Sequence, residues 1–328
     1  MARLKLTVGI SSYDHVRDLF TREHMPEGLS LRQLDLPVEE LFYRFIKWRE
    51  WEVSEVSLAK FVAMKAAGDE SIVGIPVFPS RMFRHSAMFV RAGSSLEHPS
   101  DLRGLSVGIP EWAQTAGVYI RGTLGDEFGV GLSDVRWVQA GVNQPGRVEK
   151  VSLNLPPDVE YASRPDASLA ELLAKGEIDA VFSAHAPDGT GGTAPAIRPL
   201  FRDPHAAEIA SWREHGVYPI MHTVAIRSDV LDRDAWVARS LFKGFELAKQ
   251  RSIERLNSRT ISYFPVPWIS EHAAGIWPDG GDPWPYHVEP NRHVLETFLR
   301  YCHEQGLLAS PLKPEALFTP AIDDGYRV

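Results

Sequence analysis

The chain has 328 residues, of which 44% are hydrophobic and 24% charged, and its formal net charge at pH 7 is −8. This length is enough for two lobes, because single hydrophobic cores rarely grow beyond roughly 250–300 residues. The negative charge argues against a nucleic-acid partner, which requires a basic surface. It is compatible with an anionic small ligand, since a few arginines in a cleft can bind a carboxylate within an acidic protein.

The single cysteine, Cys302, excludes an internal disulfide framework and a cysteine-based zinc site. The first ten residues lead directly into a predicted strand and lack the apolar core of a secretory signal. No run of residues approaches the ~20 apolar positions that a membrane span requires. We therefore expect a cytoplasmic protein without membrane association, and we leave open whether it forms a homo-oligomer.

Strands and helices alternate through the first part of the chain, where apolar residues recur at strand or helix spacing. Ser57 stands at the start of one predicted helix as a candidate cap. The predicted strands are Leu4–Ile10, Leu29–Leu36, Trp51–Val56, Ile72–Val77 and Ala87–Arg91, and the predicted helices are Val38–Trp48 and Ser57–Ala67.

The middle and end of the chain continue the alternation around a long irregular insertion over residues 141–165. Residues 100–110 are predicted to form a turn followed by a strand. The further predicted strands are Val135–Ala140, Val148–Leu153, Ile178–Ser183 and Tyr218–Arg227, and the predicted helices are Glu111–Gly122, Ser168–Lys175, Ala235–Asn257 and Arg292–Gly306. The turn-rich segment Pro265–Pro290 is predicted to be irregular. One crossover out and one back predict an α/β protein with two lobes around a ligand cleft. Residues 1–92 and 220–328 form lobe 1, and residues 93–219 form lobe 2.

Two arginines and a histidine lie between two predicted strands, at Arg81, Arg84 and His85. Such groups are costly to bury and need anionic partners. A guanidinium matches a carboxylate bidentately, and a histidine can move a proton near neutral pH. The alternative is a solvated connection whose arginines pair with acidic side chains of the protein.

Polar residues also follow the first predicted strand, where open α/β sheets bind ligands. They are Ser12, Tyr13, Asp14 and His15. Exposed loop polarity is the alternative interpretation. His185 and His222 each lie at an apolar strand, where a lone histidine is more often part of the core. Four histidines with a carboxylate could also hold a divalent metal, although no spacing demands one; they are His15, His85, His185 and His222.

The aromatic loop Trp277–His287 predicts either a structural plug or a wall for a flat aromatic ligand. Together with other segments, it resembles the 4,5-dihydroxyphthalate decarboxylase family, a cytoplasmic group with the fold of type II periplasmic binding proteins. The resemblance covers nearly the whole chain. It is carried by Phe78-Pro-Ser-Arg-Met-Phe-Arg-His85, Gly108-Ile-Pro-Glu-Trp112, Thr115-Ala116, Ile220-Met-His-Thr223, Trp284-Pro-Tyr286 and Asn291-Arg292.

The resemblance implies a carboxy-lyase of aromatic catabolism that converts 4,5-dihydroxyphthalate to protocatechuate and carbon dioxide, without a required cofactor. The implied acid is His85 or His222, and the implied base is His15 or Asp14. The implied substrate contacts are Arg81, Arg84, Ser12, Tyr13, Glu111, Thr115, Arg147, His185, Trp284, Tyr286 and Asn291. The alternative is a non-catalytic binding protein for an aromatic or other organic anion. A thiamine-precursor-type enzyme of the same fold is a more distant option.

Overall fold

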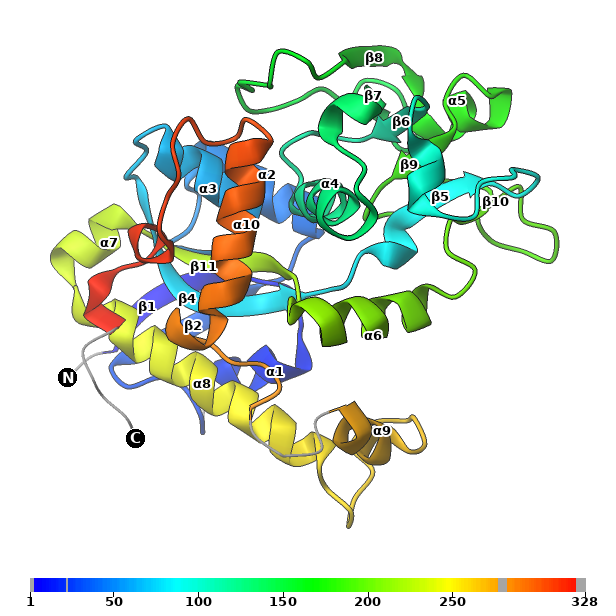
Figure 1. Ribbon diagram of the computed structural model, residues 1–328. Helices are drawn as coiled ribbons and strands as arrows, with labels where there is room; N and C mark the ends of the chain where they lie inside the picture. Colours follow the sequence, from blue (N-terminus) through cyan, green and yellow to red (C-terminus); the bar gives the residue numbers. More distant parts are fainter. Residues whose placement is uncertain (1–2, 22, 277–281, 323–328) are drawn as a thin grey trace.

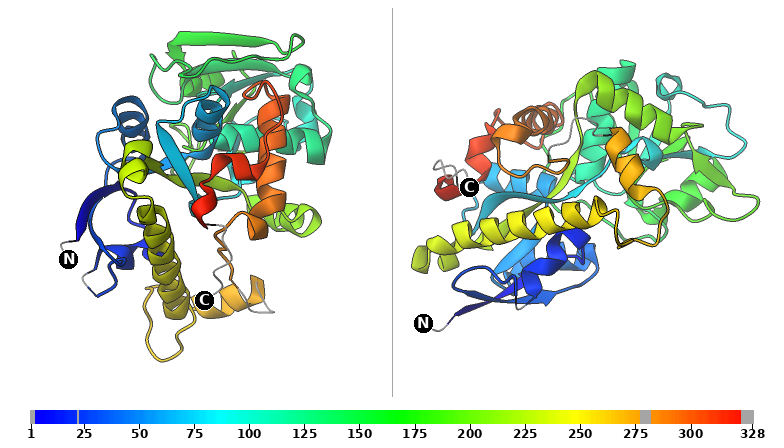
Figure 2. Two further views of the ribbon diagram at one scale, coloured as in Figure 1. Left: turned by 90° about the vertical axis from the view of Figure 1, so that its left-hand side faces the viewer. Right: turned by 90° about the horizontal axis from the view of Figure 1, so that it is seen from below.

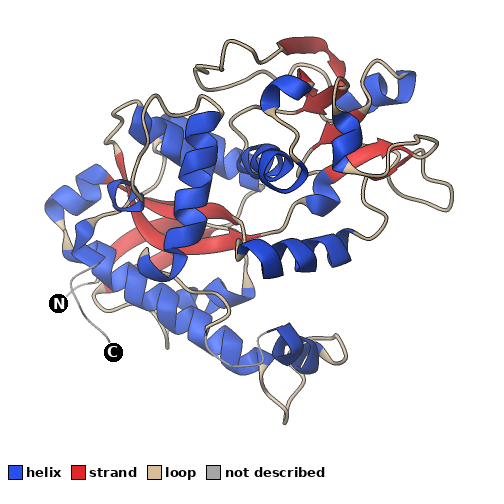
Figure 3. Cartoon of the chain, viewed as in Figure 1, coloured by secondary structure: helices blue, strands red, loops and turns tan. Residues whose placement is uncertain are grey.

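The computed structural model describes residues 3–21, 23–276 and 282–322. Within these residues the strands form two separate sheets, one in each of two lobes (Figure 1). The first sheet has the strand order β2-β1-β3-β11-β4, and the second has the order β10-β5-β9-β6-β7-β8. Figure 3 shows helices packed around both sheets. The two-lobed α/β architecture predicted from the alternating pattern is therefore confirmed.

The first lobe combines the N-terminal and C-terminal parts of the chain. Its strands are β1 (Leu4–Gly9), β2 (Leu29–Leu34), β3 (Val53–Ser57), β4 (Ile72–Arg81) and β11 (Ile220–Arg227). Its helices are α1 (Asp14–Arg17), α2 (Val38–Trp48), α3 (Leu58–Ala66), α7 (Ser228–Arg233), α8 (Trp236–Leu256), α9 (Ile269–Ile276) and α10 (Arg292–Glu304). Strand β1 is parallel to β2 and β3, and β11 is antiparallel to β3 and β4. The carboxyl ends of β1, β3 and β4 therefore meet the amino end of β11 at one edge.

The second lobe holds the middle of the chain. Its strands are β5 (Met88–Arg91), β6 (Ser106–Ile109), β7 (Arg136–Gly141), β8 (Tyr161–Ser168), β9 (Ala180–Phe182) and β10 (Ile197–Pro199), and its helices are α4 (Thr115–Phe128), α5 (Leu169–Lys175) and α6 (Pro204–His215). Strands β6, β7, β8 and β9 run parallel, whereas β5 is antiparallel to both β9 and β10.

Residues 82–87 and 200–219 connect the two sheets. Strand β5 pairs with β9 and β10, so the chain enters the second lobe before Met88. This differs from the predicted boundary at residue 92, because the polar run after β4 is itself the crossover. The chain re-enters the first sheet with β11, which begins at Ile220.

Apolar packing also joins the two lobes, because α4 of lobe 2 lies against α10 of lobe 1 (Figure 2). The rings of Tyr119 and Phe298 stack with their centroids 4.8 Å apart. The indole Nε1 of Trp112 donates to the carbonyl oxygen of Gln305 at 2.8 Å, and the Gln305 side chain accepts from Arg121. The hydrophobic core is therefore continuous from one lobe to the other.

The ends of a helix were predicted correctly where the sequence has both a capping residue at the start and a glycine at the end. Helix α5 begins after Ser168, whose side chain accepts from the Glu171 amide, and ends at Gly176 in the left-handed conformation. Ser57 does not cap α3 in this way, since its hydroxyl contacts Thr115 instead. The helix predicted from Glu111 begins only at Thr115.

The predicted strand Val148–Leu153 is wrong. Its apolar residues Val151 and Leu153 pack against the core without joining a sheet. The strand instead follows at β8, which pairs only with β7 and has an exposed, polar first part. An edge strand of this kind lacks the apolar run that marks a buried strand. Within the described part of the chain, no helix has the length and apolar character needed to cross a membrane.

The contact between α4 and α10 depends on Gly122. A Cβ at this position would lie 2.3 Å from the Tyr301 ring, whose hydroxyl donates to Asp126 at 2.6 Å and so holds the ring in place. We predict that Gly122→Ala lowers the free energy of unfolding by about 1–3 kcal/mol in urea titrations. The matched control is Gly125→Ala on the same helix, where a Cβ meets no atom within 4 Å. This change should be neutral or stabilising by up to about 1 kcal/mol. Equal effects of the two changes would contradict the account.

Candidate active site

A fully buried carboxylate, Glu55, lies on β3 at the edge where the strands of lobe 1 meet. Its Oε1 atom accepts hydrogen bonds from the Tyr13 hydroxyl and from His222 Nδ1, each at 2.6 Å. Its Oε2 atom accepts from the backbone amide of Ser11 at 3.1 Å. Donors from the loop after β1 and from β11 thus converge on one carboxylate.

These donors keep Glu55 ionised. Burial on its own would raise the pKa of the Glu55 carboxyl, but the hydrogen bonds from its three donors outweigh burial and hold this pKa below its ordinary value. Burial and the charge of Glu55 raise the pKa of Tyr13, so the Tyr13 hydroxyl keeps its proton. An ionised carboxylate only accepts hydrogen bonds, so the His222 proton must sit on Nδ1. The Nε2 atom of His222 is therefore the one available to exchange a proton.

His222 remains within reach of the cleft, because 18% of its side chain is exposed while that of Glu55 is fully covered. The ring of Phe42 packs edge-on against it with centroids 4.8 Å apart. His15 lies beside this group, 5.2 Å from the Tyr13 ring and 5.1 Å from the Trp284 ring between centroids. Its Nε2 donates to the Pro79 carbonyl oxygen at 2.9 Å. Burial lowers the pKa of His15, which favours the neutral imidazole.

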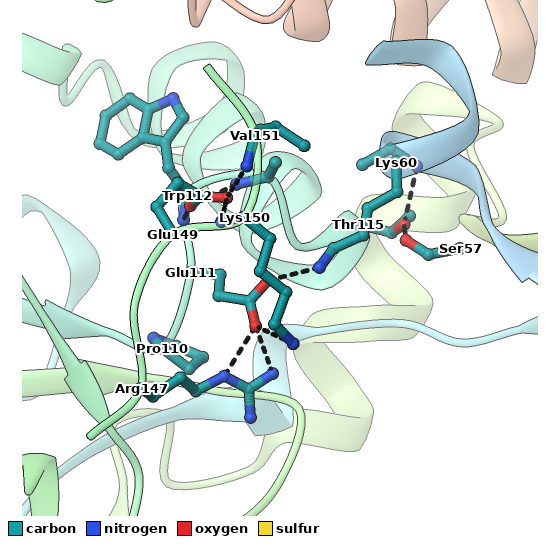
Figure 4. Close-up of polar contacts among 12 residues, drawn as sticks. Ser57, Lys60, Pro110, Glu111, Trp112, Thr115, Arg147, Glu149, Lys150 and Val151 are labelled. Carbon is teal, nitrogen blue, oxygen red and sulfur yellow. Dashed lines mark hydrogen bonds and ion pairs between the residues drawn. The ribbon is translucent and has the colours of Figure 1, made fainter. Parts of the chain in front are cut away.

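A second buried carboxylate, Glu111, follows β6 in lobe 2 and contacts three cations (Figure 4). Lys60 of α3 in lobe 1 donates to its Oε2 at 2.6 Å. Arg147 donates to Oε1 through Nε at 2.8 Å and Nη2 at 2.7 Å, and the Lys150 ammonium lies 3.3 Å from the same oxygen. Burial would raise the pKa of Glu111, but the three cations hold it below its ordinary value.

Hydroxyl contacts support this ion cluster. The hydroxyls of Ser57 and Thr115 lie 2.9 Å apart, and Thr115 also accepts from the Ala59 amide at 3.0 Å. Thr115 of lobe 2 therefore caps α3 of lobe 1. Ser57 is the register partner of His222 in the first sheet. The start of α3, which carries Lys60, therefore directly follows the strand that carries Glu55.

Two further charged groups lie between the lobes. His185, after β9, contacts the Glu39 carboxylate of α2, and this contact raises the pKa of His185. Both members of this pair interact electrostatically with Arg147. The positive charge of Arg84, in the first crossover, opposes this rise in the pKa of His185. Its Nε donates to the Met221 sulfur at 3.2 Å, and no carboxylate of the described residues forms an ion pair with it. Burial lowers the pKa of Arg84 to about 10.

Known proteins resemble this chain over its whole length. A 4,5-dihydroxyphthalate decarboxylase from Comamonas testosteroni is 34% identical over 332 aligned residues that cover 100% of both chains. A second, from Pseudomonas putida, is 35% identical over 208 residues, which cover 63% of this chain and 81% of the relative. The chain belongs to the 4,5-dihydroxyphthalate decarboxylase family. This agrees with the resemblance carried by the sequence motifs. No family model matches the chain.

Solved structures identify the fold. The periplasmic aliphatic sulphonate-binding protein SsuA from Escherichia coli superposes with a TM-score of 0.54 at 13% identity, covering 100% of this chain and 96% of that one. SsuA from Xanthomonas axonopodis pv. citri, bound to MOPS, gives 0.52 at 12% identity, covering 96% and 98%. The desulfurization enzyme DSZB gives 0.50 at 14% identity, covering 98% and 97%. This member of the decarboxylase family therefore has the type II periplasmic-binding-protein fold.

Several residues implied by the family resemblance have structural contacts instead. Arg81 is buried and donates to the carbonyl oxygens of Tyr218 and Pro285 and to the Asn291 side chain. Asn291 in turn donates to carbonyl oxygens of the segment before it. These two residues tie the C-terminal loop to β4, which differs from the implied roles of carboxylate anchor and hydroxyl ligand. Tyr286 is fully buried, with its hydroxyl unpaired and its ring 4.4 Å from the Lys249 ammonium.

The other implied residues divide between the cleft and remote sites. The Asp14 carboxylate accepts hydrogen bonds from Ser252 and Arg255 of α8. Ser12 is exposed and donates to Asp35 at 2.6 Å. Tyr13, His15, His222 and Trp284 form the group around Glu55, and Glu111, Thr115, Arg147 and His185 lie around the ion cluster.

His85 faces a different part of the molecule. Its Nε2 lies 3.4 Å from Glu127 of α4, and its ring packs against Phe201. It lines a cavity of about 140 Å³ at the crossovers, together with Arg84 and residues of α4, α6 and α10. The structure therefore does not bring His85 to His222, although the two were interchangeable candidates in the sequence. Among the described side chains, no three His, Cys, Asp or Glu residues come together as metal ligands. Residues 277–281 of the aromatic loop lie outside the described residues.

The lowered pKa of Glu55 predicts a pH-dependent contribution to stability. A carboxyl whose pKa is lower in the folded state stabilises the fold above its unfolded pKa, here about 4.5, and this contribution is lost as the pH falls through the folded value. We predict that Glu55→Gln is less stable than the wild type by about 1–3 kcal/mol at pH 7 in urea unfolding. The gap should narrow below pH 4.5. A gap that stays constant from pH 7 to pH 3.5 would mean that the Glu55 charge contributes nothing.

Proposed function

We propose that this chain decarboxylates 4,5-dihydroxyphthalate without oxidation, releasing carbon dioxide and 3,4-dihydroxybenzoate. The observation that carries the proposal is the buried Glu55–His222 pair, held at the cleft edge of a chain that matches a family member over its full length. An anion-binding protein needs charge and shape but no oriented imidazole. A hydrogen-bonded acid–base pair at the ligand edge is a feature of catalysis.

The reaction needs one proton delivered to a ring carbon. Each carboxylate of the substrate has a ring hydroxyl para to it. Removal of that hydroxyl proton pushes electrons into the ring, and the carbon bearing the carboxylate takes a proton from an acid. The carbon–carboxylate bond then breaks, its electron pair restores the aromatic ring, and the oxygen recovers its proton. Carbon dioxide leaves, and the acid regains its proton from solvent.

His222 suits the role of general acid in this scheme, and His15 suits the role of general base. The ionised Glu55 carboxylate accepts the hydrogen bond from His222 Nδ1, which leaves Nε2 as the atom that carries and delivers the proton. His15 donates from Nε2 to Pro79, so its Nδ1 is the accepting atom, and its lowered pKa keeps it neutral. His222 therefore delivers the proton to the ring carbon and His15 accepts the hydroxyl proton.

Arg84 suits one carboxylate of the substrate. It lies between the lobes, close enough to His185 to act on its charge, and none of the carboxylates in the described chain pairs with it. Glu208 acts on the charge of Arg84 without forming an ion pair with it. A partly buried guanidinium without a direct ion-pair partner favours binding of an anion, and its fork matches a carboxylate. We assign this role to Arg84 instead of Arg81, because both terminal nitrogens of the Arg81 guanidinium donate to Tyr218, Pro285 and Asn291.

The direct test is turnover of 4,5-dihydroxyphthalate by the purified protein in H₂O and in D₂O, with and without a chelator. We expect carbon dioxide release in both solvents, unaffected by chelation, and one deuterium on the ring carbon that lost its carboxylate. Turnover that is lost on chelation and restored by a divalent ion would contradict the metal-free scheme. Binding of the diacid without carbon dioxide release would favour the binding-protein alternative.

Two histidine variants test which of the two residues predicted as the general acid delivers the proton. His222→Asn should lower kcat by at least about 100-fold, because a positioned general acid contributes on the order of 10²–10⁴. His85→Asn should leave kcat within about threefold, since His85 contacts Glu127 and Phe201 instead of the Glu55 group. The measurement is steady-state kinetics on folded variants. A larger loss for His85→Asn than for His222→Asn would reverse the assignment.

A further inference from the structure

The cations around Glu111 present more positive charge than their carboxylate neutralises. We propose that Lys60, Arg147 and Lys150, held in place by Glu111, bind the carboxylate that the substrate keeps when the other is lost as carbon dioxide. This subsite rests on the proposed function, because it concerns the same cleft and the same diacid. It would make the protein selective for a ligand with two adjacent carboxylates.

Burial shows which side of the cluster is available. The side chain of Glu111 is 1% exposed, whereas those of Lys60, Arg147 and Lys150 are 16%, 28% and 43% exposed. The acid therefore lies beneath its cations, and the accessible face of the cluster is positive. Glu111 forms ion pairs with all three cations, and Glu39, which pairs with His185, also acts on Arg147.

The cations also have donors to spare. Each lysine ammonium carries three N–H donors and the guanidinium carries five. Glu111 accepts one hydrogen bond from Lys60 and contacts two nitrogens of Arg147, and the Lys150 ammonium forms an ion pair with it at 3.3 Å. Over the described ranges, Glu111 is the one carboxylate that forms an ion pair with any of the three. A second carboxylate can therefore bind without displacing Glu111.

The position of the cluster fits a diacid whose ring lies near His222. Lys60 comes from α3, directly after β3, and Ser57 at the end of β3 is the register partner of His222. Arg147 interacts with His185, on which Arg84 also acts. The cleft thus has two places for an anion, a cluster of three cations and the single guanidinium of Arg84.

The chemistry assigns the two carboxylates to these places. The departing carboxylate becomes neutral carbon dioxide, so strong pairing there would stabilise the bound substrate more than the transition state and slow the reaction. The retained carboxylate keeps its charge throughout, so strong pairing there carries no such penalty. The cluster of three cations therefore suits the retained carboxylate, and Arg84 suits the departing one.

The test measures binding of the product, which has only the retained carboxylate. We expect Arg147→Met and Lys60→Met to weaken 3,4-dihydroxybenzoate binding by at least about tenfold in calorimetry, the effect of losing one charged hydrogen bond. Lys150→Met changes a more exposed residue and should weaken binding about threefold or more without a risk to folding. Arg84→Met should leave product affinity within about twofold while raising KM for the diacid. Lys65→Met, on the same helix as Lys60, is the matched control and should change neither.

Product affinity that is unchanged in folded Arg147→Met and Lys150→Met would overturn the subsite, as would a larger loss in Arg84→Met. The proposed function fails separately, through absence of carbon dioxide release by the wild type. Phthalate and benzoate serve as non-reacting probes in that case. The subsite predicts that Arg147→Met reduces the preference for phthalate over benzoate, and an unchanged preference would contradict it.

Discussion

The interior of lobe 1 is organised around an ionised carboxylate that has no access to water. Glu55 lies on β3, between β1 and β11, and a charge there is costly unless hydrogen bonds replace its hydration. Its donors come from the loop after β1 and from β11, so satisfying the charge fixes both segments relative to β3. The hydrogen bond to Glu55 also places a proton on His222 Nδ1 and leaves its Nε2 free of this carboxylate. One buried charge thus links the folding of the sheet edge to the chemistry we propose for it.

Contacts between the lobes divide into apolar and polar sets with different consequences. On one side, α4 packs against α10 and the core runs through without interruption. At the cleft, the contacts are ion pairs and hydroxyls, namely Lys60 with Glu111, Glu39 with His185 and Thr115 with the start of α3. The cations in these contacts keep further donors for an entering anion, whereas the packed helices resist movement. The arrangement favours a cleft that adjusts around a ligand while the opposite side stays closed.

The sequence predicted the alternating elements and the two lobes, because these depend on periodicity. It also named His15 and His222 as candidates, because polar residues at strand ends face the ligand side of such sheets. It missed Glu55, although a carboxylate within the short apolar strand Val53–Ser57 was the available signal. It could not separate His85 from His222, since both follow or interrupt apolar strands and only tertiary packing decides which faces Glu127 and which faces Glu55. Arg81 and Arg84 likewise share a segment but point to different partners, which no local pattern records.

Chemical rescue tests the central claim, that His222 delivers the proton, most directly. His222→Ala is assayed for carbon dioxide release from 4,5-dihydroxyphthalate as the imidazole concentration increases. If His222 delivers the proton, the activity lost in the variant should return in proportion to the imidazolium concentration. Adding Glu55→Gln to the variant should weaken this rescue. Full activity of His222→Ala without imidazole would contradict the assignment, because the proton would then come from another group.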